Sequence, residues 1–292
     1  MEKTGDFSLL ELVECPRDAM QGWKTPIPTS DKIEYLNALL EVGFDILDFG
    51  SFVSARAIPQ MADTPQVLKG LSLGGSRTRL LAIVANVRGA EQACSQDLVS
   101  LLGYPFSVSP SFQQRNANRT IESSLKDVEQ IQAICERDGK ELLVYLSMGF
   151  GNPYGDPYSD KIVWHWVKEL AALGIKKFSL ADTVGLASPE QVGNMTAYLV
   201  QHFPQLDIGV HLHAAGAAWK PKIDAALEAG CSRFDGALKG VGGCPLAEDE
   251  LVGNIDTELM IPYFQQLGRL RPLHPGALRR SIRLAEKIFR IN

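Results

Sequence analysis

The chain has 292 residues, 45% of them hydrophobic and 22% charged, and a formal net charge of −5. This balance is ordinary for a globular protein and provides no basic surface, so nucleic acid is excluded as an expected partner. Five scattered cysteines without a CxxC pair argue against a disulfide framework and a structural zinc site, and they favour a cytoplasmic location. The polar N-terminus does not resemble a secretory signal, and no membrane association is expected.

Eight short apolar runs predict eight strands, with longer helical patterns between them. The runs are rich in Leu, Val and Ile and lack polar alternation, which is typical of parallel strands buried on both faces. They cover residues 8–14, 45–49, 79–85, 102–108, 141–147, 176–180, 207–213 and 233–238. Eight βα units predict a closed (β/α)₈ TIM barrel. The run 102–108 contains a proline and is the least regular, which leaves a doubly wound open sheet as the alternative.

The segments between the strands carry helix signals. Ser188-Pro189-Glu190 predicts a helix start. Gly43, Gly139, Gly174 and Gly230 stand just before a strand, where helix C-caps are expected. Because no linker or low-complexity tract interrupts the pattern, residues 1–292 are predicted to form one domain. The barrel covers about 6–253 and a helical C-terminal extension covers about 254–292.

Polar residues gather where the predicted strands end, which is the face at which barrels of this kind place their active sites. They are Arg17 and Asp18 after the first strand, Asp48, Asn116, Ser179, Asp182 and Thr183 at later strands, His211 and His213 on the seventh, and Cys244 and Asn254 beyond the eighth.

His211 and His213 are the sharpest of these signals. Residues two apart on a strand face the same side and can present two imidazoles to one ion, although a hydrogen-bonded structural pair has the same spacing. The carboxylate of Asp18 and the amide oxygen of Asn254 would complete a site that suits octahedral Mg²⁺ or Mn²⁺. Taken singly, Asp18 is equally compatible with a surface position and Asn254 with a helix cap.

Three further features have both a chemical and a structural interpretation. Cys244 follows a glycine-rich run that suits a mobile thiol, or it belongs to an ordinary turn; the run lacks the ending of a P-loop. Arg17 would stabilise a developing enolate oxygen or make a simple ion pair. Asp182 and Thr183 would orient the site or cap the next helix.

Longer motifs add to these single residues. They are Glu14 to Gln21, Ser51 to Ser54, Ile58 to Met61, Val67 to Gly70, Phe112 to Asn118, Ser179 to Gly185, His211 to His213, and Gly242 to Pro245. In this order they resemble the hydroxymethylglutaryl-CoA lyase family of the DRE-TIM metallolyase superfamily, over nearly the whole chain. The Gly-Gly-Cys-Pro run is more similar to the lyases than to the related Claisen-type synthases and aldolases.

The resemblance implies an enzyme that cleaves 3-hydroxy-3-methylglutaryl-CoA, or a close 3-hydroxyacyl-CoA, to acetyl-CoA and acetoacetate by a retro-Claisen reaction. It implies a Mg²⁺ or Mn²⁺ cofactor, an acyl-CoA substrate and a homodimer. The implied metal ligands are Asp18, His211, His213 and Asn254, supported by Asp182 and Glu258. The implied catalytic residues are Arg17, Asp48, His211, His213 and Cys244, and the implied substrate contacts are Arg17, Gln21, Asn116, Ser179 and Thr183.

Four departures from the family pattern concern the substrate. Asp48 replaces the usual Glu, Ala214 the usual Asp, and Ala19-Met20 the usual Gly-Leu, while the segment between Cys244 and Asn254 is one residue longer and acidic. They leave open a related acyl-CoA lyase or aldolase, or a Claisen-type synthase, acting on a different substrate. A non-catalytic metal-binding barrel is a third hypothesis, against which the complete set of predicted residues weighs.

Overall fold

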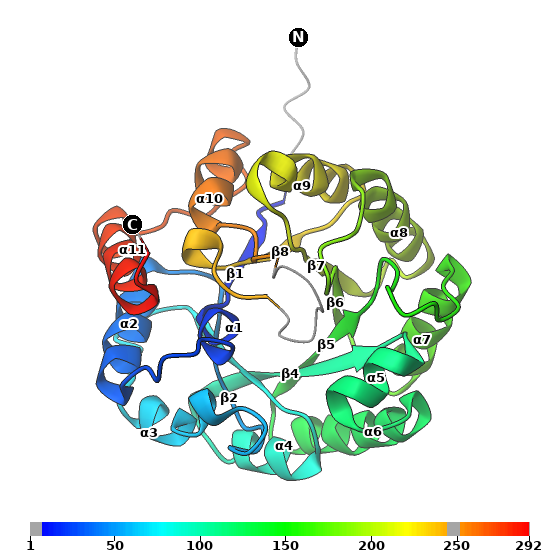
Figure 1. The fold of residues 1–292 in the computed structure, drawn as a ribbon, viewed down its shortest axis with the longest axis horizontal. Helices are drawn as coiled ribbons and strands as arrows, with labels where there is room; N and C mark the ends of the chain where they lie inside the picture. The colour runs from blue at the N-terminus through cyan, green and yellow to red at the C-terminus, as the bar shows by residue number, and fades with distance from the viewer. Residues whose placement is uncertain (1–7, 244–251, 292) are drawn as a thin grey trace.

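The computed structural model describes residues 8–243 and 252–291, which contain eight parallel strands. They are β1 Glu11–Glu14, β2 Ile46–Ser51, β3 Arg79–Ile83, β4 Val99–Ser107, β5 Glu141–Ser147, β6 Lys177–Ala181, β7 Asp207–His211 and β8 Arg233–Gly236. Each strand pairs with the next along the chain, and β8 pairs with β1 (Figure 1). The predicted closed barrel is therefore confirmed, and the open-sheet alternative is wrong.

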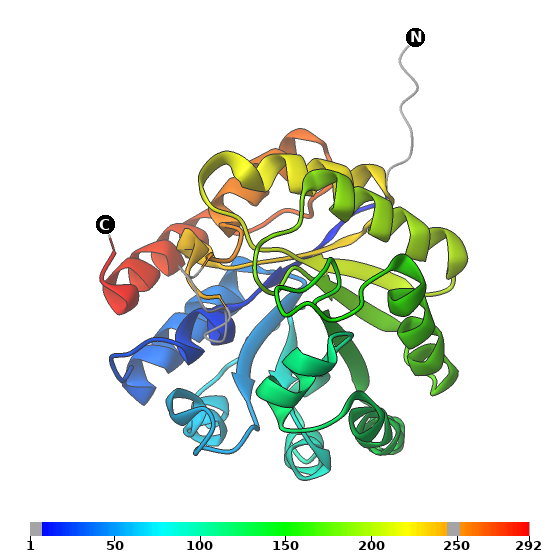
Figure 2. The same cartoon turned by 45° about the vertical axis from the view of Figure 1, so that its right-hand side comes forward.

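Helices surround the barrel, as Figures 1 and 2 show. They are α1 Pro16–Gln21, α2 Thr29–Val42, α3 Thr64–Lys69, α4 Val87–Cys94, α5 Pro110–Ala117, α6 Ile121–Arg137, α7 Asp160–Ala172, α8 Pro189–His202, α9 Trp219–Glu228, α10 Thr257–Gln266 and α11 Pro275–Phe289, with 3₁₀ turns η1 Pro59–Met61, η2 Gly216–Ala218 and η3 Leu238–Gly240. None of the helices described is long and apolar enough to cross a membrane.

The predicted C-terminal helices are α10 and α11, and they complete the outer ring. α11 packs against α2, and the backbone N–H of His274 donates to the carbonyl of Val42 at 2.9 Å. In Figure 1 the two helices lie between α9 and α2. The assignment of the whole chain to one domain stays a prediction.

Side chains of the strands form two cores because successive residues face opposite sides. The barrel interior holds Val13, Cys15, Ile46, Leu81, Ile83, Leu101, Leu143 and Tyr145. The residues between them, such as Leu12, Leu47, Leu80 and Leu102, pack outward against the helices. This arrangement explains why the strand sequences are apolar without alternation.

Arg233 is a charged residue that is fully buried on β8. Its Nη1 lies 2.5 Å from Oδ2 of Asp207, and its Nη2 donates to the carbonyl of Phe178 at 2.5 Å. The neighbouring strand makes room for it at Gly209, where an added Cβ would lie only 2.8 Å from Nη2 of Arg233. Burial of this guanidinium therefore depends on a glycine one strand away.

The strand boundaries differ from the predicted ones most at β1 and β4. β1 begins at Glu11 instead of Ser8, and β4 begins at Val99 and runs through Pro105. β4 pairs with β3 only as far as Gly103, and beyond that point it pairs with β5. Pro105 lies in this outer part, where β3 no longer requires an N–H from β4, so the proline does not interrupt the strand.

The predicted helix boundaries are confirmed at the positions with the clearest chemistry. Ser188 caps α8 through a reciprocal capping box with Gln191. Gly43, Gly139, Gly174 and Gly230 all have positive φ values, between 65° and 93°. Glycine adopts such angles without a steric penalty, which is why these helices end where they do.

Candidate active site

A cavity of about 450 Å³ opens at the carboxyl ends of the strands. Its lining includes seven of the predicted site residues: Arg17, Asp18, Gln21, Asn116, Thr183, His211 and His213. The cavity wall also includes the apolar residues Val53, Ile58, Ile83, Pro105 and Phe112. The structure therefore brings together residues from loops that follow different strands, as the barrel prediction required.

Arg17 lies at the centre of a buried ionic network. Pro16 starts α1 directly after β1, which places Arg17 and Asp18 in the first turn over the barrel mouth (Figure 1). Nε and Nη2 of Arg17 both donate to the carboxylate of Asp48, at 3.0 and 2.5 Å, and Nη1 donates to Oδ1 of Asp18 at 3.0 Å. Such paired, charge-assisted hydrogen bonds fix the plane of the guanidinium.

The pKa values of the two carboxylates beside Arg17 are shifted in opposite directions. Burial raises the pKa of Asp48 to about 6 even though Arg17 opposes the shift. Burial also acts on Asp18, but Arg17 and the two histidines outweigh it and lower its pKa to about 2. Asp18 is therefore the anion available to a cation. Asp48 has no exposed surface, and both of its oxygens accept from Arg17, which favours an orienting role for it over that of a base.

His211 is oriented by a residue that the sequence did not single out. Its Nδ1 donates to Oδ2 of Asp235 on β8 at 3.1 Å. Burial lowers the pKa of His211, but this hydrogen bond and the charge of Asp235 raise it more, for a net increase. The contact places a proton on Nδ1 and leaves Nε2 as the nitrogen that can bind a metal ion, an arrangement common for metal-binding histidines. Arg233 and Asp235, charged residues two apart in an apolar strand, were the signal available in the sequence.

His213 and Asn254 lie side by side just beyond the barrel. β7 ends at His211, two residues earlier than predicted, and His213 then forms an antiparallel bridge with Asn254. The ring centroids of the two histidines are 5.1 Å apart. Burial, assisted by His211, lowers the pKa of His213 to about 4 and keeps its imidazole neutral.

The buried atoms that lack partners test whether this set fits a metal ion. Nδ1 of His213 and Oδ1 of Asn254 have no hydrogen-bond partner among the described residues. Unpaired buried polar atoms are costly, so two beside a carboxylate indicate that the site accepts a further group. Nδ2 of Asn254 donates to Oδ2 of Asp18 at 2.8 Å, which turns Oδ1 away as a free acceptor. One carboxylate, two imidazoles and an amide oxygen are suitable ligands for a divalent cation.

Gly242 provides close backbone packing around this set. Its φ is +112°, and an added Cβ would lie 2.4 Å from Nδ2 of Asn254 and 3.0 Å from Oδ2 of Asp18. Only glycine therefore fits here without displacing a predicted ligand. Cys244, the predicted catalytic thiol of this glycine-rich run, lies outside the described residues.

A second group of donor atoms shares His211 with this site. Ligand atoms of Cys15, His211 and Asp235 lie within 4.8 Å of one another. Burial and the nearby charges of Asp235, Asp48 and Asp18 raise the pKa of Cys15 well above its usual value, which favours the neutral thiol. A thiol is a weaker ligand than a thiolate, so the predicted set around Asp18 is the better candidate.

The remaining predicted residues take varied positions. Thr183 lines the cavity and accepts a hydrogen bond from the N–H of Met148 at 3.0 Å. Asn116 is exposed at the rim on α5. Ser179 is completely buried in β6, and its hydroxyl has no partner among the described residues. Glu258 is the second residue of α10, with its carboxylate 4.0 Å from Lys239, and no contact described for it reaches the four predicted metal ligands.

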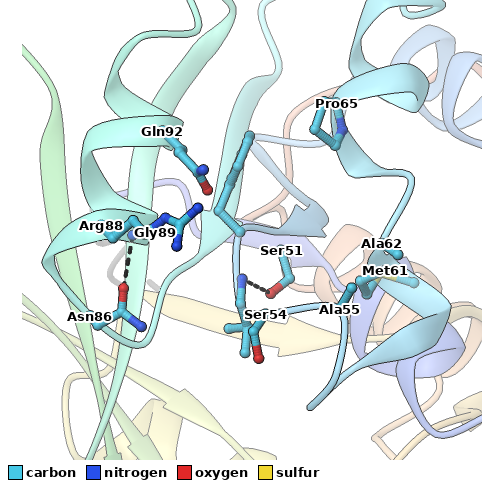
Figure 3. Close-up of a pocket in the computed structure, with 12 residues that line it drawn as sticks. Ser51, Ser54, Ala55, Met61, Ala62, Pro65, Asn86, Arg88, Gly89 and Gln92 are labelled. Atoms are coloured by element: carbon cyan, nitrogen blue, oxygen red, sulfur yellow. Dashed lines mark hydrogen bonds between the residues drawn. The ribbon is translucent and has the colours of Figure 1, made fainter.

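A neighbouring cavity of about 400 Å³ lies between the loop after β2 and the start of α4. Figure 3 shows Arg88 and Gln92 on the α4 side, facing Ser51 and Ser54. Val53 lines both cavities and forms part of the wall between them. None of the predicted site residues is among the described residues that line this second space.

The family comparison covers most of the chain. The model described as HMGL-like matches residues 12–285. The cytoplasmic 3-hydroxy-3-methylglutaryl-CoA lyase of Danio rerio is 32% identical over 255 residues, which are 87% of this chain and 75% of that protein. A hydroxymethylglutaryl-CoA lyase of Bacillus subtilis is 31% identical over 252 residues, 86% of this chain and 83% of the relative.

Solved structures agree with the sequence comparisons. The HMG-CoA lyase of Brucella melitensis superposes with a TM-score of 0.90 at 29% identity, covering 97% of this chain and 100% of the other. An HMG-CoA lyase of Acinetobacter baumannii, solved in complex with coenzyme A and 3-methylmalate, has a TM-score of 0.88 at 29% identity and covers 97% and 92%. The chain therefore belongs to the HMGL-like family and is a carbon–carbon lyase of that family.

Proposed function

We propose that this protein cleaves 3-hydroxy-3-methylglutaryl-CoA, or a close 3-hydroxyacyl-CoA, to acetyl-CoA and a 3-oxoacid such as acetoacetate. The observation that carries the proposal is the convergence of Arg17, Asp18, His211 and His213 on one cavity of about 450 Å³. The names of the relatives support the substrate class, and the coenzyme A complex of the Acinetobacter baumannii relative supports a CoA thioester.

Asp18, His211, His213 and Asn254 are proposed to hold Mg²⁺ or Mn²⁺. Support comes from the ionised carboxylate of Asp18, the neutral imidazole of His213 and the unpartnered Oδ1 of Asn254. When bound, the cation supplies the Lewis acidity that makes a substrate hydroxyl easier to deprotonate.

Arg17 is proposed to stabilise the enolate that forms during cleavage. The 3-hydroxyl loses its proton, the C2–C3 bond breaks, and the electron pair moves to the thioester oxygen. Three of the five N–H groups of Arg17 donate to Asp48 and Asp18. One N–H on Nη1 and one on Nη2 are left to donate to the thioester oxygen. The guanidinium is already oriented, so little reorganisation is needed as charge develops.

The proton transfers are assigned to residues with matching chemistry. Asp48 is occupied by Arg17, so the proposed route for the hydroxyl proton is through bound water beside His211 or His213. Cys244 is proposed to deliver the proton to C2 that completes acetyl-CoA, on the basis of the family resemblance. Gln21, Asn116, Ser179 and Thr183 stay predicted substrate contacts, and Asp182 and Glu258 stay predicted supports of the metal ligands.

The test is a coupled assay of acetyl-CoA release from 3-hydroxy-3-methylglutaryl-CoA, with and without Mg²⁺ or Mn²⁺. We expect metal-dependent release that is lost in His213→Ala. His165→Ala is the matched control, because His165 is exposed on α7. A folded, metal-bound protein that releases no acetyl-CoA would contradict the substrate assignment, and metal binding without turnover of any acyl-CoA would favour the non-catalytic barrel.

A different acyl group is the second candidate, and the apolar wall of the cavity favours it. Val53, Ile58, Ile83 and Phe112 offer a surface for an aliphatic substituent larger than methyl. A panel of 3-hydroxyacyl-CoA thioesters, scored by kcat/KM, separates this candidate from the first. A homodimer and a cytoplasmic location are also proposed, and light scattering of the purified protein tests the dimer.

A further inference from the structure

Lys222 is a buried cation that lies outside the chemistry proposed above. It occupies the first turn of α9, and its side chain is only 6% exposed. A positive charge is disfavoured near a helix N-terminus, where the helix dipole is positive, and burial adds a desolvation cost. Both costs must be offset by the contacts that the ammonium group makes.

The ammonium group of Lys222 has three hydrogen-bond acceptors. Nζ donates to Oδ2 of Asp182 at 2.7 Å, to the carbonyl of His213 at 2.8 Å and to the carbonyl of Gly185 at 3.2 Å. An ammonium has three N–H donors, so none is left for a substrate. The lysine therefore acts on its protein neighbours.

Those neighbours belong to the segments that carry the predicted metal ligands. The N–H of Asp182 donates to the carbonyl of His211 at 2.9 Å, so Asp182 contacts the first histidine directly and the second through Lys222. The third acceptor, Gly185, lies against Val252, whose Cβ would be 2.9 Å from a Cβ at position 185. Val252 is two residues before Asn254.

We propose that Lys222 is a positioning residue that fixes His213, and with it Asn254, for binding of a divalent cation. The backbone supplies a further link, because the N–H of Ala214 donates to the carbonyl of Gly253 at 3.2 Å. Residues that orient metal ligands from behind typically change metal affinity or activity by about 10- to 100-fold when they are replaced. The inference rests on the metal site of the proposed function.

Lys222→Met is the direct test, because methionine keeps much of the side-chain volume and removes the charge and the donors. Mn²⁺ affinity is measured by electron paramagnetic resonance, and coenzyme A affinity by calorimetry. We expect Mn²⁺ affinity to fall by about 10- to 100-fold with coenzyme A affinity unchanged. Lys220→Met is the matched control: Lys220 is in the same turn, its side chain is 49% exposed and it pairs with Asp224, so its loss should change neither affinity.

A double variant separates positioning from simple charge balance. Lys222→Met leaves the buried carboxylate of Asp182 without its cation, whereas Lys222→Met with Asp182→Asn removes both charges and should fold even where the single variant does not. Metal affinity should stay low in the double variant, because the hydrogen bond to His213 is still missing. Recovery to the wild-type value would overturn the positioning role.

The same measurements distinguish this inference from the proposed function. A wild-type protein that binds no Mn²⁺ would remove the metal site itself. A wild-type protein and a Lys222→Met variant that bind Mn²⁺ equally well would overturn only the role of Lys222.

Discussion

Replacing Arg17 with methionine should destabilise the protein, and more so as the pH rises. Arg17 pairs with Asp48, which has no exposed surface, and with Asp18, which is 8% exposed. The variant leaves two buried carboxylates without their cation. Breaking a buried pair in this way costs about 3–5 kcal/mol, a large part of a typical stability of about 5–15 kcal/mol.

The pH dependence follows from Asp48. Burial raises its pKa to about 6 in the folded protein, above the ordinary value of 3.8, so its contribution favours folding most at low pH and is lost as the pH rises through about 6. Arg17 limits this rise in pKa, and without it the pKa moves higher still. The gap in unfolding free energy between wild type and variant should therefore widen as the pH rises above about 6.

Denaturant unfolding followed by circular dichroism between pH 5 and pH 8, with chelator present, measures this gap. Arg17→Met with Asp48→Asn is the control variant, since it removes the buried carboxylate and should recover part of the loss at the upper end. A gap that stays constant across this range, or a single variant as stable as wild type at pH 8, would refute the argument that Asp48 depends on Arg17.

Three other perturbations have outcomes set by the structure. Gly242→Ala should cost about 1–3 kcal/mol of unfolding free energy through backbone strain and weaken Mn²⁺ binding, because its Cβ would lie 2.4 Å from Nδ2 of Asn254; unchanged calorimetric Mn²⁺ affinity would contradict this. Burial raises the pKa of Glu14 from 4.5 to about 8, so its ionisation should lower wild-type stability as the pH rises from about 4.5 to about 8. Glu14→Gln should flatten that fall in denaturant titrations, and equal slopes would count against it. Gly209→Ala should cost about 1–3 kcal/mol by crowding Arg233, and a thermal unfolding midpoint equal to wild type would show that Arg233 adapts.

The strands and several cavity residues could be predicted because their signals are local. All eight predicted runs became strands, since a short apolar run between helical patterns is typical of a parallel strand buried on both faces. The spacing of His211 and His213 directly predicted one shared face, and the ring centroids lie 5.1 Å apart. Arg17, Asp18 and Thr183 each follow a predicted strand, and this position alone predicted that they would lie at the cavity.

Other parts of the site depend on contacts that no short pattern encodes. Lys222 occurs in a helix with no local sign that its ammonium reaches a loop 40 residues earlier in the chain. Arg17 donates to both oxygens of Asp48 because α1 begins over the mouth of the barrel. The orienting contact between Asp235 and His211 required the register of β7 against β8, which pairs these two residues.

The side chain of Arg233 on β8 fills the space beside Gly209 on β7. Substitutions at these two positions therefore depend on each other. A side chain at position 209 is disfavoured while arginine remains at 233, because its first carbon would lie 2.8 Å from the guanidinium. Shortening residue 233 first would remove one of the two cations that pair with Asp207, and leave only Lys177. Each single substitution is therefore expected to lower stability, and a replacement at one of these positions is best tolerated together with a replacement at the other.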